Sequence, residues 1–164
     1  MPERSFNVLF ICTHNSVRSI MAEALLNDIG NGRLRAFSAG STPAAGPNPL
    51  ALETLARQHI STVGLRSKGW EEFAAQGAPV MDLVITVCDD AAGDVCPVWP
   101  GRPVTAHWGV EDPGRFQGND DGKRGRFDEV AGILRRRIAR LANLPFETME
   151  RQALEKKVRD IART

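Results

Sequence analysis

The stretch VLFICTHNSVRSIMAEALL, residues 8–26, constrains the fold of this chain more than any other. It opens with a continuous apolar run that stops at Cys12, and a helical pattern begins near Arg18. Such a run is typical of a strand that is covered on both faces of a parallel sheet. Only THNSV lies between the two residues. The stretch therefore predicts a strand, a tight loop and a helix, with a cysteine and an arginine at the two ends of the loop.

This loop has the composition of an anion site with a nucleophile in it. Backbone N–H groups that precede a helix, together with the positive end of the helix dipole, bind anions. Arg18 adds a planar fork of donors for two oxygens of a tetrahedral oxyanion. In this positive field the Cys12 thiol ionises easily. The competing interpretation is an inert core cysteine and a surface arginine. The loop matches neither GxxxxGK[ST] nor GxGxxG, so it does not indicate nucleotide binding.

The rest of the chain alternates strands and helices, which predicts βαβ units and a parallel sheet. We therefore expect one α/β domain over residues 1–164, a three-layer α/β/α fold with a four-stranded parallel sheet and an additional C-terminal helix. Arg135, Arg136 and Arg137 are expected on a solvated helix face. Strands are predicted at 6–12, 34–41, 80–88 and 102–108, and helices at 19–30, 49–60, within 67–75, at 127–142 and at about 146–163.

Composition excludes several classes of function. The net charge of +1 offers no field for nucleic acid or an anionic membrane. No apolar run approaches the roughly 20 residues that span a bilayer, and the first residues lack the features of a signal peptide. We therefore expect a cytoplasmic protein, in which the three cysteines are reduced thiols and not structural disulfides. The cysteine spacing is not CxxC, so no metal site is predicted.

Four motifs resemble the low-molecular-weight protein tyrosine phosphatase superfamily, which includes arsenate reductases of the thioredoxin-coupled type. The motifs are CTHNSVRS, SAGS at 38–41, VITVC at 84–88 and EDP at 111–113. The resemblance implies a low-molecular-weight phosphatase-like fold, with Cys12 as nucleophile and Ser19 as hydrogen-bond donor to its thiolate. Asn15 would brace the loop in a left-handed conformation, which asparagine tolerates. The implied oxyanion-binding residues are Thr13, His14, Asn15, Ser16, Val17, Arg18 and Ser19.

CTHNSVRSIMAE is especially similar to the arsenate reductase branch, and two further cysteines fit that branch. Cys88 ends the predicted third strand at the same sheet edge as Cys12, and Cys96 follows among small and polar residues. Thiols brought together there can exchange disulfides. By resemblance, Cys88 is the second thiol and Cys96 the third, and their disulfide is presented to thioredoxin, glutaredoxin or another external thiol. Alternatively, both are incidental thiols.

The resemblance makes Asp112 the general acid, although Asp-Pro is also a common start of a turn. Tyrosine phosphatases of this superfamily wall the substrate phenol with aromatic side chains. The chain has no tyrosine, no aromatic residue at 41–49, and only Phe116 after the Asp-Pro pair. A small inorganic oxyanion needs no such walls.

Three hypotheses follow from these motifs. The leading one is a monomeric arsenate reductase without cofactor, which also binds phosphate or sulfate as analogues. The alternative is a phosphatase that hydrolyses phosphotyrosine or small phosphoesters through a Cys12 phosphoenzyme. The third is a non-catalytic oxyanion or redox sensor.

Overall fold

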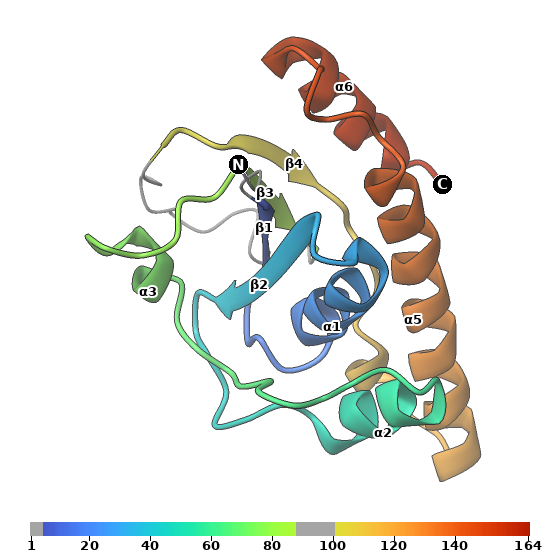
Figure 1. The fold of residues 1–164 in the computed structure, drawn as a ribbon. Coiled ribbons are helices and arrows are strands. Elements are labelled where there is room, and N and C mark those ends of the chain that lie inside the picture. The colour runs from blue at the N-terminus through green and yellow to red at the C-terminus, as the bar shows by residue number, and fades with distance from the viewer. Residues whose placement is uncertain (1–4, 88–100) are drawn as a thin grey trace.

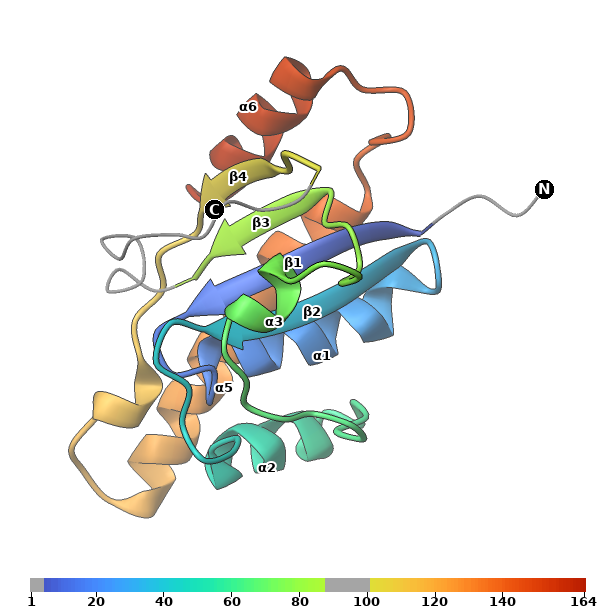
Figure 2. The ribbon, with the colours of Figure 1, turned by 90° about the vertical axis from the view of Figure 1, so that its left-hand side faces the viewer.

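The computed structural model describes residues 5–87 and 101–164. A parallel sheet of four strands crosses its centre in the order β2-β1-β3-β4 (Figure 1). Parallel strands carry their carboxyl ends to one edge, and in Figure 2 all four arrowheads point the same way. At that edge Cys12 pairs with Gly40, and Ile11 with Thr86. The strands are β1 (Phe6–Cys12), β2 (Leu34–Gly40), β3 (Leu83–Thr86) and β4 (Val104–His107).

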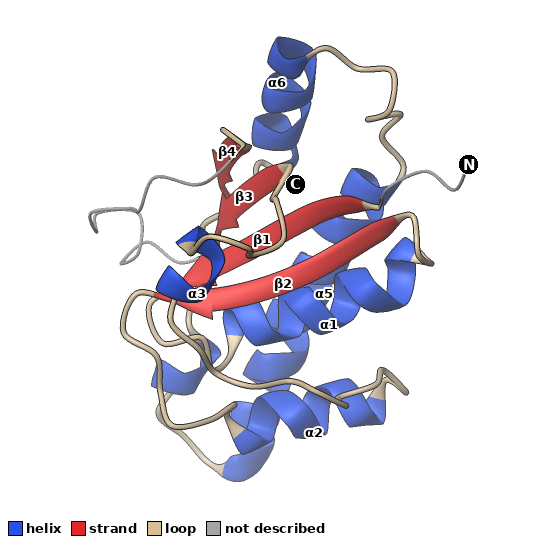
Figure 3. Cartoon of the chain, turned by 60° about the vertical axis from the view of Figure 1, so that its left-hand side comes forward, coloured by secondary structure: helices blue, strands red, loops and turns tan. Residues whose placement is uncertain are grey.

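Helices cover both faces of the sheet (Figures 1 and 3). The long helices α1 and α5 lie on one face, and α2 packs against both of them. On the other face, Phe73 of α3 meets Phe37 of β2 with ring centroids 5.6 Å apart. The predicted α/β fold with a four-stranded parallel sheet is confirmed. The helices are α1 (Arg18–Gly30), α2 (Pro49–Arg57), α3 (Glu71–Ala74), the 3-10 turn η1 (Pro113–Arg115), α5 (Asp120–Ala142) and α6 (Arg151–Ile161).

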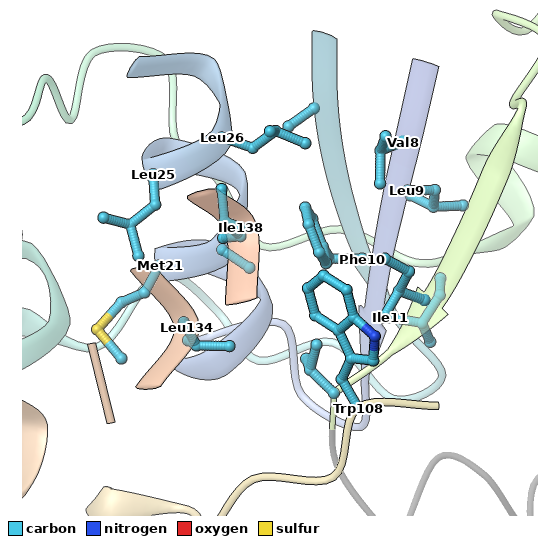
Figure 4. Packing of buried hydrophobic residues seen from close by; sticks show 14 of the residues in the cluster. Val8, Leu9, Phe10, Ile11, Met21, Leu25, Leu26, Trp108, Leu134 and Ile138 are labelled. Atoms are coloured by element: carbon cyan, nitrogen blue, oxygen red, sulfur yellow. The ribbon is translucent and has the colours of Figure 1, made fainter. Parts of the chain in front are cut away.

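A large part of the core lies between the sheet and the helices α1 and α5 (Figure 4). Phe10 of β1 contacts Trp108 with ring centroids 6.2 Å apart, and the indole nitrogen of Trp108 donates to the Val158 carbonyl of α6 at 2.8 Å. Burying a large apolar side chain contributes about 1.5–3 kcal/mol. The fully buried side chains in this layer include Phe10, Met21, Leu25, Leu26, Trp108, Leu134 and Ile138.

Three predicted helix boundaries are wrong. The helix predicted at 49–60 ends at Arg57, and His59 just after it has a positive φ of 60°. The helix predicted from residue 127 begins at Asp120, because Asn119 caps it by accepting the Gly122 N–H at 2.7 Å and two aspartates occupy its first turn. The C-terminal helix begins at Arg151 and not near 146, because Phe146 stacks on Phe6 and fixes an irregular connection there.

The predicted third strand, 80–88, is also too long at its start. The Asp82 carboxylate accepts the backbone N–H of Asn7 at 2.8 Å, and the regular ladder begins only at Leu83. Among the helices of the described residues, none has the length and apolar character needed to cross a membrane.

Candidate active site

The loop of residues 13–17, which we call the anion loop, turns its carbonyl groups outward. Because the C=O and N–H of one peptide unit point in opposite directions, the N–H groups of this loop point inward. Val17 precedes α1 without a side-chain cap, so the first turn of the helix adds its own N–H groups. Together they form a concave set of donors suited to an anion. The outward bonds join the carbonyls of Cys12, Thr13, His14 and Ser16 to the N–H groups of Ser41, Thr42, Ala44 and Asn48, at 3.3, 2.8, 2.9 and 2.9 Å.

Asn15 sets the polarity of a hydrogen-bond chain that ends at the nucleophile. Its φ of 49° confirms the predicted left-handed conformation. Its side-chain amide donates to Ser19 Oγ at 2.8 Å and to Ser38 Oγ at 2.9 Å. Ser19 Oγ also lies 3.0 Å from Cys12 Sγ. Since the Ser19 oxygen accepts from Asn15, its own proton is available to the Cys12 sulfur.

A charge pair lies behind the anion loop. Ser38 Oγ donates to Glu23 Oε1, at 2.5 Å. The Lys68 ammonium lies 3.7 Å from the same Glu23 oxygen and 3.4 Å from Asn15 Oδ1, which also accepts the Lys68 backbone N–H at 3.0 Å. Burial raises the pKa of Glu23 and lowers the pKa of Lys68. Of this network only Asn15 belongs to the predicted site, because Glu23, Ser38 and Lys68 come from three other segments of the chain.

Arg18 and Asp112 meet across the mouth of the site. Arg18 Nη1 donates to the Val110 carbonyl at 3.1 Å, and Nη2 lies 3.7 Å from Asp112 Oδ2. Arg18 Nε is buried and has no hydrogen-bond partner among the described residues, so it is a donor suited to an incoming oxyanion. Asp112 also caps η1 by accepting the Gly114 N–H at 2.9 Å.

A cavity of about 470 Å³ lies beside this pair. Among the described residues that line it, Phe116 is the one aromatic side chain, and the charged groups are of both signs. The cavity therefore offers little surface for stacking a phenol ring. Its lining residues are Arg18, Gly109, Val110, Glu111, Asp112, Arg115 and Phe116.

The structure thus brings most of the predicted site residues to one sheet edge. The loop residues and Ser19 lie with Cys12, and Asp112 reaches Arg18. His14 is exposed, with Nδ1 3.1 Å from the Thr42 carbonyl. Cys88 and Cys96 lie outside the described residues. Within residues 5–87 and 101–164, no three His, Cys, Asp or Glu side chains are arranged to hold a metal ion.

Comparison with known proteins agrees with this geometry. Residues 7–160 match the family described as low molecular weight phosphotyrosine protein phosphatase. An arsenate reductase of Bacillus subtilis is 34% identical over 135 residues, which cover 82% of this chain and 94% of the relative. An arsenate reductase of Halalkalibacterium halodurans is 35% identical over 135 residues, with the same coverage.

Two solved structures share the fold. A thioredoxin-dependent arsenate reductase of Corynebacterium glutamicum has a TM-score of 0.60 and 30% identity, covering 82% of this chain and 61% of its own. An arsenate reductase of Archaeoglobus fulgidus has a TM-score of 0.64 and 28% identity, covering 84% of this chain and 99% of its own. The family expected from the four motifs is confirmed: this chain belongs to the low molecular weight phosphotyrosine protein phosphatase family.

Proposed function

We propose that this protein reduces arsenate to arsenite with thiols as the electron source. The main support is the combination of an anion loop around a hydrogen-bonded cysteine with relatives that are named arsenate reductases at about a third sequence identity. Arsenate is a tetrahedral oxyanion and fits donors that converge on one point. Three reduced thiols also suit the cytoplasm, where we place the reaction.

In the first step the Cys12 thiolate attacks arsenic, and one arsenic–oxygen bond breaks. The inward N–H groups and Arg18 hold the remaining oxygens. Asp112 protonates the departing oxygen, which leaves as water. The Arg18–Asp112 separation of 3.7 Å supports this assignment, because it brings the acid close to the oxyanion clamp.

In the second step the Cys88 thiolate attacks the Cys12 sulfur. The electron pair of the sulfur–arsenic bond moves to arsenic, which leaves as arsenite, and a Cys12–Cys88 disulfide forms. Cys96 then attacks Cys88, releases the Cys12 thiolate, and leaves a Cys88–Cys96 disulfide. An external dithiol such as thioredoxin or glutaredoxin reduces that disulfide. The thioredoxin-dependent relative supports this choice of reductant.

One contact supports a role for Cys88. Val87, the residue before it, donates its N–H to the Ile11 carbonyl at 2.8 Å. Ile11 is the residue before Cys12. Cys12 and Cys88 are therefore each the next residue in the sequence after one of two residues whose backbones are hydrogen-bonded to each other.

The second candidate is hydrolysis of phosphotyrosine or small phosphoesters. The name of the family and the Arg18–Asp112 pair favour it. In that reaction Cys12 takes the phosphoryl group, Asp112 protonates the leaving alcohol, and water then cleaves the phosphoenzyme. Among the described residues that line the cavity, Phe116 is the one aromatic side chain, and this argues against a phenolic substrate.

The test is NADPH oxidation with thioredoxin and thioredoxin reductase, with arsenate as the only acceptor. The unmodified protein and the Cys12→Ser and Cys88→Ser variants are compared, and each is also given p-nitrophenyl phosphate. The proposal expects arsenate-dependent turnover that both substitutions abolish.

Other outcomes point elsewhere. Arsenate turnover that survives Cys88→Ser would disprove the relay. Hydrolysis of p-nitrophenyl phosphate without arsenate turnover would establish the phosphatase. Binding of arsenate with no turnover under any reductant would favour the sensor.

A further inference from the structure

Arg137 does not lie where its sequence neighbours suggested. The solvated helix face expected for residues 135–137 holds for Arg135 and Arg136 but is wrong for Arg137, which is only 8% exposed. Arg137 follows Leu134 by three residues, and this spacing places it on the buried face of α5. Burial of a guanidinium is costly unless its donors are used.

Arg137 contacts the segment that leads from β4 to η1. We call residues 109–112 the strand-to-lid segment. Arg137 Nη1 donates to the Gly109 carbonyl at 3.2 Å. Arg137 Nε is buried and has no partner in the part of the chain that the structure describes. Burial also lowers the pKa of Arg137. A guanidinium nevertheless stays charged at neutral pH, so its hydrogen bond to the Gly109 carbonyl is charge-assisted.

Two arginines from different helices therefore bind consecutive carbonyls of the strand-to-lid segment. Arg137 of α5 holds Gly109, and Arg18 of α1 holds Val110. Two residues later, Asp112 Oδ2 lies 3.7 Å from Arg18 Nη2. The Val110 N–H is bonded to the Val87 carbonyl at 3.3 Å, so the segment is also joined to the end of β3.

A second contact from α5 reaches Glu111 of this segment and Phe116 beyond it. Arg126 lies 5.1 Å from the ring centre of Phe116, and its Nη1 is 3.8 Å from Glu111 Oε2. The side chains of Arg126 and Glu111 are 41% and 70% exposed, so this contact is screened by water. The buried Arg137 bond is the stronger constraint on where the segment leaves β4.

We infer that Arg137 is a positioning residue: by holding the Gly109 carbonyl, it sets the place of Val110 and Asp112 against Arg18. The inference rests on the proposed function only where it treats Asp112 as the acid. A residue that merely stabilises the core would lower kcat whether or not Asp112 is present. If Arg137 is a positioning residue, its effect on kcat requires Asp112.

The test uses Arg137→Met, which keeps much of the volume and removes the charge. Relief of desolvation offsets the unpaired Gly109 carbonyl, so we expect a small change in the free energy of unfolding. The amides of Val110 and Gly114 should exchange hydrogen about tenfold faster, since the segment loses an anchor. Phosphate affinity, measured by calorimetry, should stay within about twofold, because the anion loop and Arg18 remain.

Turnover is then compared in two backgrounds, with arsenate and with p-nitrophenyl phosphate. Arg137→Met should lower kcat about tenfold in the otherwise unmodified protein and less than about twofold in the Asp112→Asn background. Arg137→Lys, which keeps one donor, should restore part of the loss. Arg140→Gln, an exposed arginine one turn further along α5, is the matched control and should change none of these quantities.

Two results would overturn the inference. One is unchanged exchange at Val110 and Gly114 in Arg137→Met, which decides the question even if the protein turns over neither substrate. The other is an equal loss of kcat in both backgrounds, which would mean that Arg137 does not act through Asp112. If Arg137→Met does not fold, the same readings are taken on Arg137→Lys, where an intermediate effect on exchange is required.

Discussion

The ammonium of Lys68 lies 3.7 Å from Oε1 of Glu23, behind the anion loop and away from solvent. The two side chains are only 9% and 14% exposed. Burial raises the pKa of Glu23 and lowers that of Lys68, so for each group desolvation outweighs the attraction of its partner. The pair is joined to Cys12 through Ser38, Asn15 and Ser19. It therefore stabilises the conformation of the loop that carries the nucleophile.

Removing one member of this pair should destabilise the fold. Lys68→Met leaves the Glu23 carboxylate buried without a cation, and we expect the free energy of unfolding to fall by about 2–4 kcal/mol. Urea denaturation measures this. The exposed pair of Arg66 and Glu72 is the control, and Arg66→Gln should cost less than about 1 kcal/mol. The combination Glu23→Gln with Lys68→Met should recover part of the loss. Full stability of Lys68→Met would contradict the role of the pair.

The raised pKa of Glu23 predicts a dependence of stability on pH. The folded state holds the Glu23 proton more tightly than the unfolded state does, whose carboxyl titrates near 4.5. As the pH rises from there through the folded-state pKa, the contribution of Glu23 to the free energy of unfolding therefore falls, and that contribution is constant above. Glu23→Gln should remove this fall. Urea unfolding at a series of pH values measures the difference between the two proteins. Glu71→Gln, at an exposed glutamate, should keep the original slope.

The sequence predicts those parts of the molecule that depend on neighbours along the chain. The run at 6–12 forms β1 with these bounds. The helix predicted at 19–30 begins one residue earlier, at Arg18, and ends at Gly30 as predicted. Such elements follow from local periodicity. The apolar pattern does not predict the first turns of α5, because residues 120–126 carry no apolar face. The Asn119 cap alone marks the start of the helix.

The candidate site divides in the same way. The anion loop could be predicted because the strand, the cysteine, the arginine and the helix are consecutive. Lys68 could not, since it reaches Asn15 across 53 positions of the chain and sits in a segment with no repeating pattern. The prediction for Arg137 is wrong for a different reason: three consecutive arginines are typical of a charged surface. Its spacing of three from Leu134 and four from Leu141 was the available signal.

Gly40 should be intolerant of a side chain because the anion loop lies against it. A Cβ at this position would lie 2.6 Å from the Thr13 carbonyl oxygen and 3.0 Å from the Asn15 nitrogen. Neither backbone atom can move without displacing the loop. Gly40→Ala should therefore weaken phosphate binding at least about tenfold, as a displaced donor set would. Calorimetric titration with phosphate measures this. Gly46→Ala meets nothing within 4 Å and should bind as before, and normal binding by Gly40→Ala would show that the loop can adapt.

Ser19 should make the Cys12 thiol more acidic. Its hydroxyl lies 3.0 Å from the sulfur, and its own acceptor position is filled by Asn15. A donor to a thiolate stabilises the charged form, so Ser19→Ala should raise the pH at which the thiol ionises. The measurement is the rate at which iodoacetamide alkylates Cys12, as a function of pH. Cys88 and Cys96 are replaced by serine in both proteins, so that Cys12 is the one thiol. Ser41→Ala is the control, because the buried Ser41 hydroxyl has no hydrogen-bond partner within the described residues. An equal shift in both variants would assign the effect to packing and not to the hydrogen bond.

Cys96→Ser should separate the two halves of the proposed relay. Without a third thiol, Cys88 still attacks Cys12 and releases arsenite, but the Cys12–Cys88 disulfide then stays in the enzyme. We expect each reduced molecule to produce close to one arsenite and then stop under thioredoxin, which acts on the later disulfide. Quenched samples analysed for arsenite and, by peptide mass spectrometry, for the linked cysteines give both readings. Cys88→Ser is the comparison and should release no arsenite. Continued turnover by Cys96→Ser would mean that the reductant attacks the Cys12–Cys88 disulfide directly, and the relay would then need two cysteines and not three.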